Sequence, residues 1–337
     1  DLFYIGAAIN EDIIMGRDSK SENIVRSEFN SITPENSLKW MYVQPTPNHF
    51  NFVAGDKYVE LGVKDNMYIV GHALVWHNQL ADFMKRTESS GEFINHVENH
   101  IGTVVSRYKG KIDAWDVVNE AFNEDGSLRS SVFKNQMGDN YIENVFKLAE
   151  ISDPDADLIY NDYNLYKPAK LAGVLEMVKR LQSNGTKISA IGAQAHWRLN
   201  SPSLKEIEQI ILNISELGVE VMFTELDITV LPNPWKLVGA EVTQNFSKFE
   251  GDPKMNPYEN GLPQSIEKQL AKRYEDIFKL FIKHQDKISR VTFWGVMDKH
   301  SWLNDWPIKG RTNYPLLFDR YYKPKLAYNK LINLIGN

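Results

Sequence analysis

Short apolar runs alternate along the chain with longer segments in which apolar positions recur every three or four residues. The short runs are nearly continuous in apolar and β-branched residues, which is typical of parallel strands whose two faces are both covered. They predict eight strands, at 4–9, 29–33, 67–76, 112–118, 157–160, 188–193, 219–226 and 290–296.

The longer segments predict amphipathic helices. In the segment 170–183, Leu171, Val174, Val178 and Leu181 share one face, and the following Asn-Gly pair is a helix stop signal. Similar patterns cover 203–217, 270–284 and 325–335. An open doubly wound sheet also fits this alternation. Eight strand–helix units without a Gly-rich phosphate loop favour a (β/α)8 TIM barrel, which we expect to occupy residues 1–337 as a single domain.

A barrel of this kind carries its chemistry at the carboxyl ends of its strands. Two predicted strands run directly into a glutamate there, because the fourth ends in WDVVNE at Glu120 and the seventh in TELD, which contains Glu225. An unpaired buried carboxylate costs on the order of several kcal/mol. Each glutamate therefore needs either a structural partner or a function, and the presence of two favours a catalytic pair.

The other predicted strand ends are also rich in polar and aromatic side chains. They supply Glu35, Asn36, Lys39, His72, Trp76, Gln79, Tyr163, Gln194, His196, Trp294 and Trp302. Amide, imidazole and amine groups bind hydroxyls, and indole rings stack on the C–H faces of sugars, so this set suits a neutral polyhydroxylated ligand. A phosphorylated substrate would favour arginine or a glycine loop.

Composition excludes several classes of protein. The 38 basic and 44 acidic residues give a net charge of −6, which argues against nucleic-acid or anionic-membrane partners. The chain has no cysteine, so disulfides, zinc–thiolate sites, iron–sulfur clusters and cysteine nucleophiles are excluded. No apolar run approaches the roughly 18 residues of a membrane span, and we expect no membrane insertion by this chain.

Eight segments, one for each predicted strand, resemble the glycoside hydrolase family 10 xylanases. They are 3–8 (FYIGAA), 33–40 (TPENSLKW), 71–77 (GHALVWH), 115–120 (WDVVNE), 161–164 (NDYN), 191–196 (IGAQAH), 224–227 (TELD) and 293–296 (FWGV). The resemblance covers essentially the whole chain and implies the same barrel fold. It implies an endo-1,4-β-xylanase that hydrolyses internal bonds of xylan with retention and needs no cofactor or metal ion.

The resemblance also assigns roles. Glu120 matches the general acid/base and Glu225 the nucleophile of a double displacement, which implies carboxyl groups about 5–5.5 Å apart. His196 matches the residue that hydrogen-bonds the nucleophile, and Asp227 is expected to orient it. Asn119 matches the contact to the sugar 2-hydroxyl. The charge on Glu225 is expected to raise the pKa of Glu120.

The remaining matches concern substrate binding. Three residues are expected to bind hydroxyls one sugar from the cleavage point: Glu35, Asn36 and Lys39. Five are expected to form walls of the cleavage subsite: His72, Trp76, Gln194, Trp294 and Trp302. Gln79 and Tyr163 are expected at the rim, and Lys39 could also pair with Glu35. The long segment 231–263 is expected to shape the aglycone end of the cleft.

Three other functions stay open. A related β-1,4-glycanase, such as a glucanase, would use the same two glutamates but needs room for the C6 hydroxymethyl group. A metal-dependent sugar isomerase could use strand-end His, Glu and Asp on this fold, although the carboxylates here are spread singly over the strands. A glycan-binding protein could keep the cleft without catalysis, although both glutamates are present.

We further expect a monomer whose partners are xylan and xylo-oligosaccharides. We expect it to be secreted, periplasmic or at the cell surface, with its export signal absent from this chain.

Overall fold

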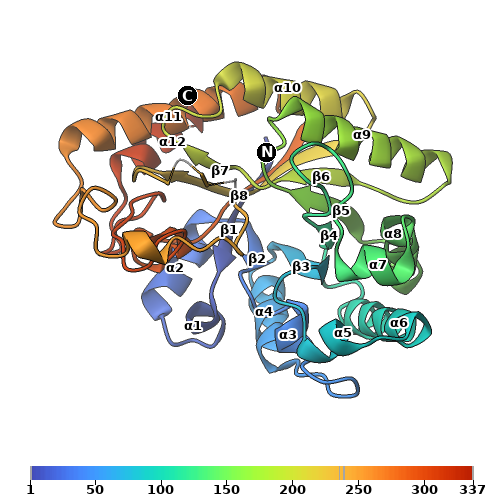
Figure 1. Ribbon diagram of the computed structural model, residues 1–337. Coiled ribbons are helices and arrows are strands. Elements are labelled where there is room, and N and C mark those ends of the chain that lie inside the picture. The colour runs from blue at the N-terminus through green and yellow to red at the C-terminus, as the bar shows by residue number, and fades with distance from the viewer. Residues whose placement is uncertain (1, 235, 238–239, 336–337) are drawn as a thin grey trace.

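The computed structural model describes residues 2–234, 236–237 and 240–335. Eight parallel strands form a barrel inside a ring of helices (Figure 1): β1 Tyr4–Ile9, β2 Ser31–Pro34, β3 Tyr68–Trp76, β4 Ala114–Asn119, β5 Asp157–Asp162, β6 Ala190–Ala193, β8 Glu220–Thr229 and β9 Ile288–Phe293. The sheet closes because β1 pairs with both β2 and β9 and β6 pairs with β8. The predicted (β/α)8 barrel is confirmed.

Helices follow the strands along the chain. They are α1 Glu11–Ile14, α2 Ser19–Glu28, α3 Trp40–Val43, α4 Val53–Lys64, α5 Asp82–Arg86, α6 Ser90–Arg107, α7 Val132–Met137, α8 Tyr141–Ser152, α9 Pro168–Ser183, α10 Leu204–Ser215, α11 Gln264–Lys283 and α12 Leu326–Ile335. Within the described residues, no helix combines the length and the apolar character that a membrane crossing requires.

The helix boundaries follow local sequence signals. α9 begins with proline in its first turn and stops just before Gly185, whose φ of +69° only glycine adopts at little cost. α10 begins with a capping box, in which Ser203 and Glu206 satisfy each other's backbone amides. All four helices predicted from periodicity are present, and the one predicted at 270–284 is the carboxyl-terminal part of the longer α11.

Several strands extend further than the apolar pattern predicts. β4 continues to Asn119, β5 to Asp162 and β8 to Thr229. Pairing with a neighbouring parallel strand uses backbone hydrogen bonds, which form whether a side chain is polar or apolar. β9 instead ends at Phe293, before the predicted end, and Gly295 follows with a φ of +129°. These extensions carry polar side chains onto the rim of the barrel.

A further strand, β7 His196–Arg198, is absent from the predicted set, because three residues are too few for a periodic pattern. It pairs in parallel with the end of β8, and the pairing sets His196 opposite Asp227. β7 thus places two predicted site residues side by side.

Candidate active site

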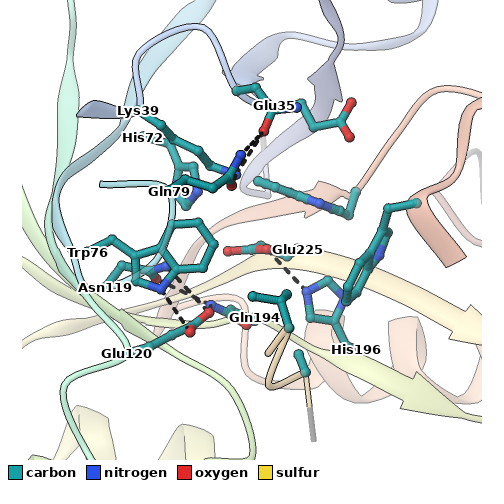
Figure 2. A pocket seen from close by; sticks show the side chains of 15 residues that line it. Glu35, Lys39, His72, Trp76, Gln79, Asn119, Glu120, Gln194, His196 and Glu225 are labelled. Atoms are coloured by element: carbon teal, nitrogen blue, oxygen red, sulfur yellow. Dashed lines mark hydrogen bonds and ion pairs between the residues drawn. The ribbon is translucent and has the colours of Figure 1, made fainter. Parts of the chain in front are cut away.

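The carboxyl ends of the strands surround a cavity of about 140 Å³ (Figure 2). Its lining contains every predicted site residue except Tyr163 and Asp227, namely Glu35, Asn36, Lys39, His72, Trp76, Gln79, Asn119, Glu120, Gln194, His196, Glu225, Trp294 and Trp302. Ala240 and Val242, from the segment after β8, also line it.

Glu120 is buried in this cavity at the end of β4. Trp76 Nε1 donates to its Oε2 at 2.9 Å, and Gln194 Nε2 donates to its Oε1 at 3.0 Å. The pKa of Glu120 is raised to about 7, chiefly by burial, with smaller contributions from the charges of Asp162 and Glu225, while the two hydrogen bonds oppose the rise. The charge of Glu225 raises this pKa as expected, but burial is the larger cause.

Glu225 has the opposite environment. Its Oε2 lies 3.1 Å from His196 Nε2, and its Oε1 accepts from Asn161 Nδ2 at 2.8 Å. Burial alone would raise the pKa of Glu225, but the bond from His196, the charges of His72 and His196 and the Asn161 amide hold it below its usual value. Gly192 makes room for that amide, since a Cβ there would lie 2.4 Å from Asn161 Oδ1.

His196 lies between two carboxylates. Its Nδ1 is 3.0 Å from Asp227 Oδ2, and Trp302 Nε1 donates to the same oxygen at 2.8 Å. Burial opposes the charged form of His196, yet Asp227 and Glu225 raise its pKa to about 10, so the imidazolium form holds both carboxylates at neutral pH. Asp227 therefore lies behind His196, within reach of its second ring nitrogen.

Removing the His196 charge should shift the acid limb of activity. In His196→Gln the amide still reaches Glu225 but carries no charge, so the pKa of Glu225 rises. Because Glu225 must be ionised to react, we expect the acid limb of kcat/KM to move to higher pH by about one unit. The measurement is a pH–rate profile. Trp302→Phe, which removes a neutral donor from Asp227, is the control, and an unmoved acid limb in His196→Gln would contradict this account.

Amide side chains connect the two glutamates. Asn119 Oδ1 accepts from Asn161 Nδ2 at 3.0 Å and from Gln194 Nε2 at 3.3 Å, and those two amides also bind Glu225 and Glu120 respectively. Asn161 was not predicted as a site residue. Its signals were its place directly after the predicted strand 157–160 and at the start of the family-like segment 161–164.

The far end of the cavity holds a second polar group. Lys39 Nζ donates to Gln79 Oε1 at 2.8 Å and to Asn36 Oδ1 at 3.1 Å, and it lies 4.8 Å from the centre of the Trp76 ring (Figure 2). Among the contacts of the described residues, none joins Lys39 directly to Glu35, so the alternative of an ion pair is not found. Burial raises the pKa of Glu35 and lowers that of Lys39.

Aromatic rings also line the cavity. Trp294 contacts the His72 ring edge-on with centroids 5.3 Å apart, and Trp302 stacks on Trp306 at 4.5 Å. His72 is in turn held by Asp116, whose Oδ2 lies 2.8 Å from its Nδ1. These neighbours fix the orientation of the indole and imidazole rings before any ligand binds.

Tyr163 does not reach the cavity. Its side chain is buried, and its hydroxyl accepts a hydrogen bond from Arg129 Nη2 at 3.0 Å. The predicted rim contact of Tyr163 is therefore replaced by a contact behind the wall. The carboxylate of the preceding Asp162 also has protein partners. It forms an ion pair with Lys170 Nζ at 2.8 Å and accepts a hydrogen bond from the Tyr160 hydroxyl at 2.5 Å.

The part of the chain that the structure describes contains no group of three or more His, Asp or Glu that could hold a metal ion.

Comparison with known protein families identifies this chain. The sequence model of glycosyl hydrolase family 10 matches residues 1–334. The chain belongs to glycosyl hydrolase family 10.

Two relatives in family 10 illustrate the similarity in sequence. The chain is 40% identical to endo-1,4-beta-xylanase A of Xylanibacter ruminicola, over 98% of this chain and 90% of the relative. It is 39% identical to endo-1,4-beta-xylanase of Geobacillus stearothermophilus, over 98% of this chain and 96% of that relative.

Solved family 10 structures agree with the fold. A GH10 endoxylanase retrieved from a sugarcane soil metagenome superposes with a TM-score of 0.95 at 46% identity and covers 98% of this chain and 97% of that one. Xylanase 10B from Thermotoga petrophila, solved in complex with xylobiose, has a TM-score of 0.86 at 32% identity. The match covers 99% of this chain and 94% of that one. Each covers nearly the whole chain, so the similarity is not confined to a motif.

Proposed function

We propose that this family 10 hydrolase is an endo-1,4-β-xylanase that acts with retention, with Glu225 as nucleophile and Glu120 as general acid/base. One observation carries the assignment of roles: two buried carboxyls in one polar cavity have pKa values displaced in opposite directions. A carboxyl that keeps its proton near neutral pH is suited to donate it, and one that is ionised is suited to attack.

The first step forms a glycosyl-enzyme. Glu225 Oε attacks the anomeric carbon while the bond from that carbon to the leaving oxygen breaks, and Glu120 transfers its proton to that oxygen. In the second step the ionised Glu120 takes a proton from water, whose oxygen displaces Glu225 from the anomeric carbon. Two inversions at one carbon give net retention. Both glutamates return to their starting protonation states.

The rest of the cavity supports a neutral sugar chain as the ligand. Amides and amines around Glu35, Asn36 and Lys39 offer hydrogen-bond partners for hydroxyls, and Trp294 and Trp302 supply flat apolar faces. The relatives named above are xylanases, and the Thermotoga petrophila structure holds xylobiose. These similarities favour xylan over other β-linked glycans.

A comparison of polysaccharides tests the proposal. We expect rapid release of reducing ends from xylan and little from carboxymethyl cellulose, whose C6 hydroxymethyl groups need additional space. Proton NMR of freshly cut xylohexaose should show the β-anomer first, before mutarotation. Faster cleavage of the cellulose derivative would favour the glucanase alternative, and an initial α-anomer would overturn the retaining mechanism.

We also propose that the enzyme acts outside the cytoplasm, because a polymeric substrate cannot cross a membrane to reach it.

A further inference from the structure

Behind the cavity wall, one arginine joins three separate parts of the barrel rim. Arg129, between β4 and α7, donates from Nε to the backbone carbonyl of Glu120 at 3.1 Å and from Nη2 to the Tyr163 hydroxyl at 3.0 Å. Its Nη1 donates to Glu241 Oε2 at 2.8 Å. The guanidinium therefore connects the end of β4, the end of β5 and the segment that follows β8.

This ion pair is shielded from water. The side chains of Arg129 and Glu241 are only 18% and 14% exposed, so their attraction is screened less than that of a surface pair. Glu241 Oε1 also accepts from the Thr243 hydroxyl at 2.8 Å and from its backbone amide at 3.2 Å. The carboxylate is held from two sides, which fixes the position of its backbone.

The residues on either side of Glu241 belong to the active-site wall. Ala240 and Val242 both line the cavity, whereas Glu241 points back to Arg129. Because the same guanidinium binds the carbonyl of Glu120, this wall lies on the side of the acid/base. A general acid/base faces the leaving part of the substrate, so a wall on this side would adjoin the aglycone.

Glu120 itself depends on the same contact. Its φ is +58°, a left-handed backbone conformation that a non-glycine residue adopts at a cost. The hydrogen bond from Arg129 to its carbonyl helps to hold that conformation. The side chain of Glu120 consequently keeps its direction into the cavity.

We propose that Arg129 and Glu241 are positioning residues that hold Ala240 and Val242 as the aglycone wall and tie this wall to the backbone of Glu120. The inference rests on the proposed roles of Glu120 and Glu225. A wall on the aglycone side matters only when a sugar occupies that side. Substrates whose leaving group is a sugar should therefore depend on it more than substrates whose leaving group is a small phenol.

Glu241→Gln tests the wall. We expect kcat/KM on xylopentaose to fall about tenfold, equivalent to about 1.4 kcal/mol, with a rise in KM, and kcat/KM on nitrophenyl β-xylobioside to change less than about twofold. Glu250→Gln is the matched control, because it makes the same charge change at an exposed position further along this segment. Equal losses on both substrates, or no loss on xylopentaose, would overturn the proposal.

Two further variants keep the test decisive if Glu241→Gln folds poorly. Thr243→Val removes one bond to Glu241 without changing its charge and should give a smaller loss with the same substrate selectivity. Arg129→Lys keeps the charge, but a single ammonium cannot reach all three partners. It should lower activity most on aryl xylobiosides with poor leaving groups, which need the proton of Glu120.

If Arg129→Lys lowers activity on every aryl xylobioside by one common factor, the arginine is only structural and the proposal is wrong. The proposed function is judged separately: its failure would show as a wild-type protein that does not cleave xylan.

Discussion

Glu225→Ala should lower turnover on xylan by several orders of magnitude while xylan binding is retained. The substitution removes the group that attacks the anomeric carbon but leaves Glu35, Asn36, Lys39 and the tryptophan walls in place. Removing an interaction made only in the transition state lowers kcat without weakening ground-state binding. Initial rates on xylan, together with calorimetric titration of xylohexaose, measure the two effects.

A small external nucleophile provides the control for this variant. Azide can enter the space left by the Glu225 side chain and attack from the same face of the sugar. On an activated aryl xylobioside it should restore turnover and give the α-xylobiosyl azide, the product of a single inversion. A Glu225→Ala enzyme that cleaves xylan at a near-normal rate would refute the assignment of the nucleophile.

Glu120→Ala should lower kcat/KM on xylan about 10³-fold, within the usual range for loss of a general acid. Because burial raises the pKa of Glu120 to about 7, the wild-type enzyme keeps the proton below that pH and loses activity as the pH rises through it. The variant has no such proton to lose, so the basic limb of its pH–rate profile near 7 should disappear. Profiles of both enzymes on xylan measure this.

Activated substrates separate the two steps that Glu120 serves. A nitrophenolate leaves without protonation, so the first step should remain fast in Glu120→Ala, whereas water attack lacks its base and becomes slow. The glycosyl-enzyme on Glu225 should then accumulate, visible as a burst of nitrophenol and as a mass increase of the protein. A basic limb near pH 7 that persists in Glu120→Ala would assign the acid/base role to another group.

The amino-acid sequence by itself determined the architecture and most of the cavity lining. Strand and helix periods are local properties, and parallel strands of a barrel all end on one rim. A polar side chain at the end of an apolar run, such as Glu120 or Glu225, is therefore located without knowledge of any contact. The pairing of His196 with Asp227 followed from the family resemblance, and their positions on β7 and β8 agree with it.

Only the tertiary structure decided which side chains contact one another and what shifts the pKa of each catalytic carboxyl. Tyr163 stands at a strand end like the others, yet its hydroxyl turns away from the cavity to Arg129. Burial, which depends on every neighbour, outweighs the charge of Glu225 in raising the pKa of Glu120. The contact of Arg129 with Glu241 joins residues 112 positions apart, in segments without a periodic pattern. Local sequence encodes where a strand ends, but the partners of a side chain depend on residues that only the closed barrel brings together.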